Sequence, residues 1–285
     1  MEYADIRLTQ EFAFTRKLAR LTEHEMHMHD TLEVSILLEN NIRYHLAQGD
    51  YVGKPGDIFV FRPFDPHWNL AEDQERPAAW IMLLLSPAVV RHIPDGSALL
   101  APFYTTDWRP LIPAHSAEAA AIRAAAGQAV EEEERGRPGW QSRQFACLIE
   151  ILVQIARYFL ALRQDARTGE DSAPGGGIVG AVERLLRQFR EPVDMEDVIR
   201  ASGLKKTTFY QQFVRLTALT PNDFVNRLRL QHAVHLLLHS AMPITEIAFE
   251  SGYSSVSYFN RQFKAFRGVS PRQFRAEGGG GASDA

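Results

Sequence analysis

The stretch ITEIAFESGYSSVSYFNRQFKAFRGVSPRQFR, residues 244–275, has the pattern of two helices joined by a tight turn. Thr245 is placed to cap a short first helix, and Gly252 supplies the positive φ that a tight turn requires. Ser254 or Ser255 can cap the second helix. The phenylalanines of this second helix recur at i, i+4 and i+7 and give it one apolar face; they are Phe259, Phe263 and Phe266.

The opposite face of the second helix is polar and partly basic. A rotation of 100° per residue away from the phenylalanines places this face on Ser257, Asn260, Arg261 and Lys264. A helix with an apolar back and such a front is the one that a helix-turn-helix inserts into the DNA major groove. We therefore expect these four side chains to contact DNA, with Arg261 suited to guanine, Asn260 to adenine and Lys264 to a phosphate.

A repeat of this pattern lies about fifty residues upstream, within residues 193–221. Phe209, Phe213 and Gly203 correspond to two phenylalanines and the turn glycine of the later stretch, with one residue fewer in the turn. By the same helical rotation, the side chains expected to face DNA are Lys206, Thr207, Tyr210 and Gln211. The chain therefore carries two helix-turn-helix units, and we predict a single long helix over residues 221–239 between them.

These residues closely resemble the signature of the AraC family of bacterial transcription regulators, and the resemblance covers nearly all of residues 178–275. The matching positions are Ile244, Ile247, Ala248, Gly252, Tyr253, Tyr258, Phe259, Arg261, Phe263, Lys264, Gly268, Ser270, Pro271, Phe274 and Arg275. The first unit departs from the family, because Gln211 and Val214 stand where Arg and Lys are usual. We expect this unit to bind DNA more weakly than its relatives do, or to favour a different half-site.

The charge of the chain is divided unevenly along its length. Residues 178–275 carry 14 Lys and Arg against 8 Asp and Glu, a net charge of +6, whereas the remainder carries −10. A basic module on an acidic body is expected of a DNA-binding domain attached to a sensor. The single cysteine, Cys147, excludes an internal disulfide and favours a cytoplasmic location. No uninterrupted apolar run approaches the roughly 18 residues of a membrane span, so we expect no membrane partner.

The N-terminal half has the pattern of a small β-structure. Short β-branched or aromatic runs occupy 32–39, 41–46, 50–63 and 78–87, with turn residues between them. These runs predict a small barrel or double-sheet roll. Two helices are predicted after it, over 117–135 and about 140–163, and in regulators that resemble this one such helices form the dimer contact.

Polar residues with the spacing H-x-H-(x)3-E, followed later by a further histidine, lie in this half. They are His27, His29, Glu33 and His67. In a strand His27 and His29 share one face, and Glu33 joins them if the strand is unbroken. The pattern resembles the metal-binding motifs of the cupin fold, and three imidazoles with a carboxylate suit Mn, Fe, Ni or Zn.

Three roles are compatible with this quartet: the rim of a ligand pocket, structural hydrogen bonding, or a metal site. We expect the first, with no metal and no cofactor, and with Trp68 as a further ligand contact. Trp68, Trp80 and Trp108 are suited to stack on a sugar ring, although ordinary core aromatics fit the same positions.

The sequence thus predicts an α+β multidomain protein. Its parts are a cupin-like β-roll plus two helices at 1–164, a flexible linker at 165–177, an all-α domain with two helix-turn-helix units at 178–276, and a disordered tail at 277–285. The expected function is a dimeric, sequence-specific transcription activator, controlled by a small molecule such as a sugar. It would act on promoter DNA and RNA polymerase, without catalytic residues. The alternatives are a metal-dependent cupin enzyme with a DNA-binding tail and a ligand-free docking module.

Overall fold

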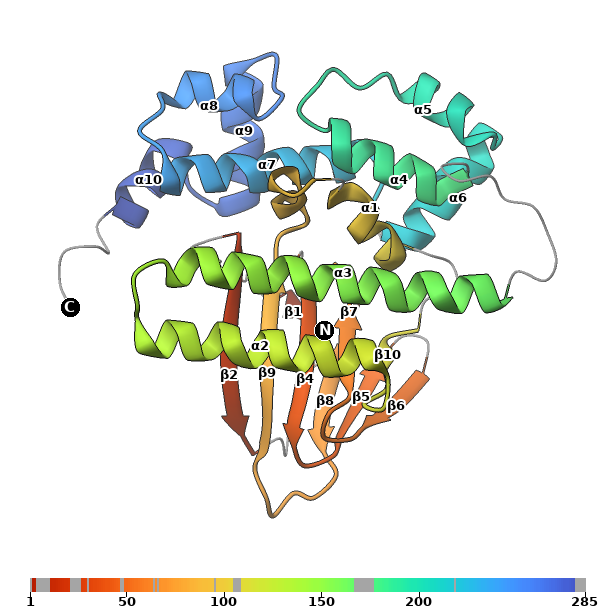
Figure 1. The fold of residues 1–285 in the computed structure, drawn as a ribbon. Coiled ribbons are helices and arrows are strands. Elements are labelled where there is room, and N and C mark those ends of the chain that lie inside the picture. The colour runs from red at the N-terminus through yellow and green to blue at the C-terminus, as the bar shows by residue number, and fades with distance from the viewer. Residues whose placement is uncertain are drawn as a thin grey trace. The chain divides into compact units, whose positions relative to one another are not determined.

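The computed structural model describes residues 2–3, 11–20, 27–29, 31–46, 49–63, 65, 67–94, 96–104, 109–166, 177–217 and 219–279. These residues form two compact units, one made chiefly of residues 12–166 and the other chiefly of residues 177–279 (Figure 1). Most of the predicted linker, and the predicted tail beyond residue 279, lie outside the described residues.

Two facing sheets make up the β-structure of the first unit, which confirms the predicted roll. The described strands form one sheet in the order β1-β3-β8-β5-β6 and another in the order β10-β7-β4-β9-β2. The strands are β1 (Glu2–Tyr3), β2 (Phe12–Ala19), β3 (His27–Met28), β4 (Leu32–Glu39), β5 (Ile42–Leu46), β6 (Gly49–Gly53), β7 (Ile58–Phe61), β8 (His67–Ala71), β9 (Ala78–Leu85) and β10 (Leu111–Ile112).

Aromatic side chains join the two sheets. The ring centroid of Tyr44 on β5 lies 4.2 Å from that of Phe59 and 5.2 Å from that of Phe61, both on β7. All three side chains are fully buried. Because successive residues of a strand point to opposite faces, this core also fixes which side chains of β5 point outward.

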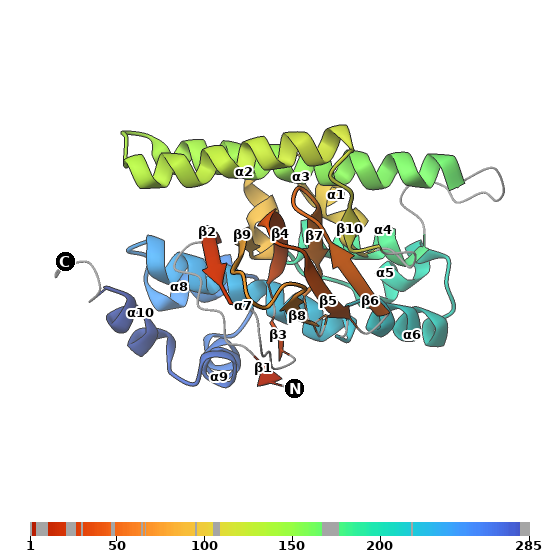
Figure 2. The same ribbon diagram turned by 90° about the horizontal axis from the view of Figure 1, so that it is seen from below.

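Two long helices, α2 (Ala117–Arg135) and α3 (Trp140–Ala166), lie side by side against the sheet that contains β2 and β9 (Figures 1 and 2). Ser116 caps α2 by accepting a hydrogen bond from the backbone of Ala119, and Gly136 ends it in a left-handed conformation. The shorter helical segments of this unit are η1 (Pro87–His92), α1 (Gly96–Leu100) and η2 (Ala101–Tyr104).

Part of α3 contradicts the expectation that no stretch is long and apolar enough for a membrane span. By length and composition alone, Trp140–Leu162 is such a stretch. The count of uninterrupted apolar residues missed it because Glu150 and Arg157 interrupt a segment that is apolar on average. Core helices of water-soluble proteins meet the same criterion, and 39% of this window is buried inside the unit.

The second unit is helical and contains the two predicted helix-turn-helix pairs, α5–α6 and α8–α9. The long helix predicted between them is α7, with Thr220 as its N-cap and Pro221 in its first turn. The helices are α4 (Gly177–Gln188), α5 (Met195–Ser202), α6 (Lys206–Thr217), α7 (Pro221–His239), α8 (Ile244–Glu250), α9 (Val256–Arg267) and α10 (Pro271–Gly279).

One predicted helix cap is wrong and another is confirmed. Pro243 occupies the N-cap position of α8, and Thr245 lies within the first turn of that helix. A proline before the helix sets the chain direction through its fixed φ, so this start does not depend on a hydroxyl acceptor. Ser255 caps α9 by accepting a hydrogen bond from the backbone of Tyr258 at 3.3 Å.

The turn between α8 and α9 requires glycine for two reasons. Gly252 has a φ of +87°, which side chains rarely adopt. A Cβ atom at this position would lie 2.7 Å from the carbonyl oxygen and 2.8 Å from the Cα of Arg190, just after α4. The turn therefore lies directly against the backbone that follows α4.

We expect Gly252→Ala to destabilise the second unit more than Gly268→Ala does. Gly268 has a φ of +77°, and an added Cβ would meet none of the described residues within 4 Å. Its substitution should therefore cost only the left-handed backbone term, about 1–2 kcal/mol. Gly252→Ala adds the clash with Arg190. Urea unfolding of both variants measures the difference, and equal losses of unfolding free energy would contradict this role of the close contact.

Candidate DNA interface and ligand site

The helix α9 presents the predicted polar face to solvent. Phe259 and Phe263 are fully buried on its other side, where their ring centroids lie 5.7 Å apart. The predicted DNA-facing residues of α9, Ser257, Asn260, Arg261 and Lys264, are all exposed. The amphipathic pattern of the sequence therefore predicted which face of α9 is exposed.

Tyr258 adds a surface aromatic beside this face, a role that the helical rotation did not predict for it. Its side chain is 44% exposed, and the guanidinium carbon of Arg261 lies 5.2 Å from its ring centroid. The i,i+3 spacing of Tyr258 and Arg261 is the signal that predicts such a contact. Stacking on a ring restricts the directions in which Arg261 can extend.

The helix α6 presents a less basic face. Lys206, Thr207 and Gln211 are exposed and Tyr210 is half-buried. Lys206, predicted to face DNA, has its ammonium 2.5 Å from the Glu196 carboxylate on α5. This ion pair is solvent-exposed, so it holds the lysine only weakly.

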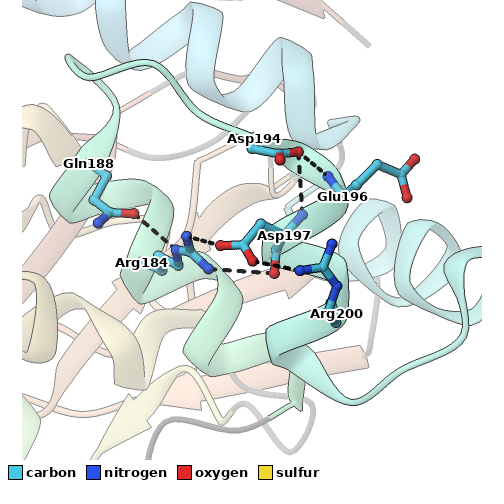
Figure 3. A network of polar contacts seen from close by, with 6 residues as sticks. All are labelled: Arg184, Gln188, Asp194, Glu196, Asp197 and Arg200. Carbon is cyan, nitrogen blue, oxygen red and sulfur yellow. Dashed lines mark hydrogen bonds and ion pairs between the residues drawn. The ribbon is translucent and has the colours of Figure 1, made fainter.

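The helix α5 is fastened to α4 by a network of charged side chains (Figure 3). Arg184 on α4 donates to the Asp197 carboxylate at 2.6 Å, and Arg200 donates to its other oxygen at 3.2 Å. The hydrogen bond and charge of Arg184 hold the pKa of Asp197 below its usual value. Asp194 caps α5 by accepting hydrogen bonds from the backbone of Glu196 and Asp197.

A buried cluster of ionisable side chains lies in the β-roll. His29 Nε2 is 3.2 Å from Glu33 Oε2, and His67 Nε2 is 3.6 Å from the same oxygen. Ser35 donates a hydrogen bond to the other oxygen of Glu33 at 2.8 Å. His29, Glu33 and His67 are all buried, with 1%, 6% and 2% of their surfaces exposed.

The Glu33 carboxylate and the His67 imidazole shift each other's pKa. Burial alone would raise the pKa of Glu33, but hydrogen bonds from His29 and His67 outweigh it and hold this pKa well below the usual value. Burial opposes charge on His67 as well, yet the Glu33 carboxylate raises the pKa of that ring. His67 also donates from Nδ1 to the Asp65 carbonyl at 2.8 Å. Glu33 therefore favours the charged form of His67, and His67 favours the charged form of Glu33.

The same three residues fit a metal ion. Their ligand atoms lie within 4.8 Å of one another. Nδ1 of His67 faces the Asp65 carbonyl and Nδ1 of His29 faces the Thr31 carbonyl, at 2.8 and 3.1 Å. Backbone carbonyls commonly orient metal-binding histidines in this way and leave the Nε2 atoms for the ion.

The strand that was predicted to align the motif is broken. The strand β3 ends at Met28 and belongs to one sheet, whereas β4 begins at Leu32 in the other. His29 and Glu33 therefore meet where the chain passes between sheets, not by alternation along one strand. His27 pairs with His67 in backbone register, but its side chain lies outside the described residues.

The predicted ligand-stacking tryptophans do not form one group. Trp68 stacks on His45 with centroids 3.7 Å apart. Both neighbour an inward residue, His67 or Tyr44, so they lie on the outer face of their sheet. Trp80 is 7% exposed and belongs to the hydrophobic core, and Trp108 lies outside the described residues.

The chain combines a β-roll that holds a buried polar cluster with two recognition helices that pack on aromatic cores. These are the parts of a DNA-binding regulator with a sensor domain. A family model described as AraC-like ligand binding domain matches residues 11–152, and one described as helix-turn-helix domain matches residues 198–277. The chain belongs to the AraC family of transcription regulators.

Curated relatives match most of the chain. The HTH-type transcriptional activator RhaS of Escherichia coli O1:K1 is 28% identical over 254 residues, 87% of this chain and 86% of that protein. RhaS of Pectobacterium carotovorum subsp. carotovorum (strain PC1) is 26% identical over 250 residues, with the same coverage of both chains. Among solved structures, ToxT of Vibrio cholerae aligns with 92% of this chain and 98% of its own, at 13% identity and a TM-score of 0.43.

The buried pair should make the stability of the β-roll depend on pH in two directions. Because the pKa of Glu33 is lowered, its carboxylate stabilises the fold at pH values above the unfolded pKa of ~4.3. This stabilisation is lost as the pH falls through the folded pKa. The raised pKa of His67 contributes stability below its unfolded value of ~6.5, and this is lost as pH rises through the folded pKa.

Glu33→Gln should flatten both limbs of this profile, because it removes the charge that both shifts require. Urea unfolding followed by tryptophan fluorescence across pH measures the effect. Glu39→Gln, at the exposed end of the same strand, is the matched control and should keep the wild-type profile. Identical profiles for Glu33→Gln and wild type would contradict the mutual stabilisation of the Glu33 and His67 charges.

Proposed function

We propose that this protein activates transcription from specific promoters in response to a small molecule. The observation that carries the proposal is the pair of recognition helices, α6 and α9, each with an exposed polar face on a buried phenylalanine core. Activation is proposed because the curated relatives described above are transcriptional activators. An activator acts through RNA polymerase, which we propose as a partner, and the cytoplasm as the place of action.

The contacts with DNA are proposed by side-chain chemistry. Arg261 donates two hydrogen bonds to a guanine edge, and Asn260 and Gln211 pair with adenine. Lys206 and Lys264 contact phosphates. The remaining side chains of the polar faces of α6 and α9 are small or half-buried, and they contact the DNA backbone. They are Thr207, Tyr210 and Ser257.

The effector site is proposed at the buried cluster of the β-roll. Two imidazoles and a carboxylate present both donors and acceptors, which suit the hydroxyl groups of a sugar. His29, Glu33 and His67 are the core of this site, and His27 is proposed with them from its register opposite His67. Trp68, on the outer face of the sheet, is proposed only as a contact at the edge of the effector.

The protein is proposed to act as a dimer through α3. Leu160 and Leu162 on this helix are 49% and 39% exposed, whereas Phe159 beside them is buried. Exposed leucines beside an otherwise buried stripe favour burial against a second copy of the same helix. We also propose that the protein is not an enzyme, since its family consists of transcription regulators.

A second candidate function, a metal-dependent sensor or enzyme, is favoured by the convergence of His29, Glu33 and His67. Metal analysis of protein purified without added ions separates the two candidates. On the proposed function we expect less than one ion per chain and full DNA binding. A stoichiometric ion that is lost together with DNA binding in His29→Ala would support the metal-dependent candidate instead.

Arg261→Ala should weaken binding to a selected DNA site by roughly 1–3 kcal/mol and relax the preference at one base position. In vitro selection with wild-type protein first identifies the site, and binding to single-base variants then measures the preference. Lys264→Ala, the matched control, should weaken binding to all sequences about equally and reduce its salt dependence. A uniform loss in Arg261→Ala would make Arg261 a phosphate contact and refute its proposed role.

A further inference from the structure

A polar bridge connects the second recognition helix to the long helix α7. Asn226 on α7 donates from Nδ2 to the side-chain oxygen of Gln262 on α9 at 3.0 Å. The hydroxyl of Tyr253, in the turn before α9, donates to Asn226 Oδ1 at 2.7 Å. Because both ends of the Asn226 amide have partners, its orientation and that of Gln262 are fixed together.

The bridge is held in place from the side of α4. Arg229, one turn further along α7, donates to the carbonyl oxygens of Phe189 and Glu191 at 2.6 and 2.9 Å. These carbonyls follow the last turn of α4, where backbone acceptors lack helical donors. The guanidinium carbon of Arg229 also lies 5.9 Å from the ring centroid of Tyr253.

Burial makes this arrangement specific. Tyr253 is 4% exposed, and its ring lies 5.2 Å from that of Phe259, centroid to centroid. Burial raises the pKa of the Tyr253 phenol, so the hydroxyl stays protonated and able to donate. A buried hydroxyl that loses its acceptor is unfavourable, which favours the bridged arrangement over alternatives.

The bridge determines which way the DNA-facing side chains point. Gln262 directly follows Asn260 and Arg261 on α9, and successive residues of a helix are rotated by about 100°. When Gln262 is tied to α7, α9 cannot rotate about its axis without breaking a hydrogen bond. The stacking of Arg261 on Tyr258 then sets the remaining direction of the guanidinium.

We propose that Asn226 is a positioning residue for base recognition by Arg261. It does not contact DNA; it fixes the rotation of α9 through Gln262 and Tyr253. This role rests on the proposed function, in which Arg261 contacts a base. This gives a part in sequence preference to a half-buried asparagine on α7, the helix between the two helix-turn-helix pairs.

The test uses the full chain and the DNA site selected by the wild-type protein. Asn226→Ala should reduce the preference for the base that Arg261 contacts by roughly tenfold, measured as the affinity ratio between the selected site and its single-base variant. Preference at bases contacted by α6 should stay unchanged. In an Arg261→Ala background, Asn226→Ala should change the ratio no further, because both substitutions remove the same contact.

Asn222→Ala is the matched control, since it makes the same chemical change at an exposed position of α7. Tyr253→Phe tests the bridge with little change in shape and should reduce the same ratio by a smaller factor. Gln262→Leu should reproduce the effect of Asn226→Ala from the other end. Thermal unfolding of each variant confirms that the compared proteins are folded.

The outcomes separate this proposal from the proposed function. In a first outcome, the wild type selects a sequence, but Asn226→Ala weakens binding equally at the bases contacted by α6 and by α9, or adds to the effect of Arg261→Ala. The positioning role is then overturned and the proposed function stands. If the wild type selects no sequence, the proposed function fails, and the positioning role fails with it because there is no base contact to position.

Discussion

The DNA-binding unit depends on the close contact between the turn at Gly252 and the backbone at Arg190. Because Gly252 has no Cβ, the turn can approach the backbone after α4 closely. In this arrangement Tyr253 reaches Asn226, and Arg229 reaches the carbonyls after α4. The second helix-turn-helix is thereby joined to the segment that carries the first by more than the covalent connection through α7. Two recognition helices held in this way can act on one DNA face.

In the β-roll, a buried Glu33–His67 pair lies where apolar side chains would otherwise pack. Removing Glu33 and His67 from water is costly, and their mutual attraction with the Ser35 and Asp65 hydrogen bonds offsets that cost. A polar effector bound here must replace the hydrogen bonds that it displaces. This requirement links the electrostatics of the cluster to its proposed role as the effector site.

Local sequence patterns predicted the elements well, because helical periodicity and capping are local. The long helix α7 begins and ends at the predicted residues, and so do α2 and β4. What the sequence could not show depends on contacts between distant segments. The break between β3 and β4, the outward direction of Trp68 and the bridge from Asn226 to Gln262 all arise from pairing across sheets or helices.

The central claim is that both recognition helices bind DNA together as one rigid pair. Hydroxyl-radical footprinting of the full chain on its selected site tests this claim most directly. If the two recognition helices are rigidly joined, two segments on one face of the duplex should be protected. Their centres should lie about 34 Å, or one helical turn of DNA, apart. A single protected segment, or two segments whose spacing varies between sites, would contradict the account.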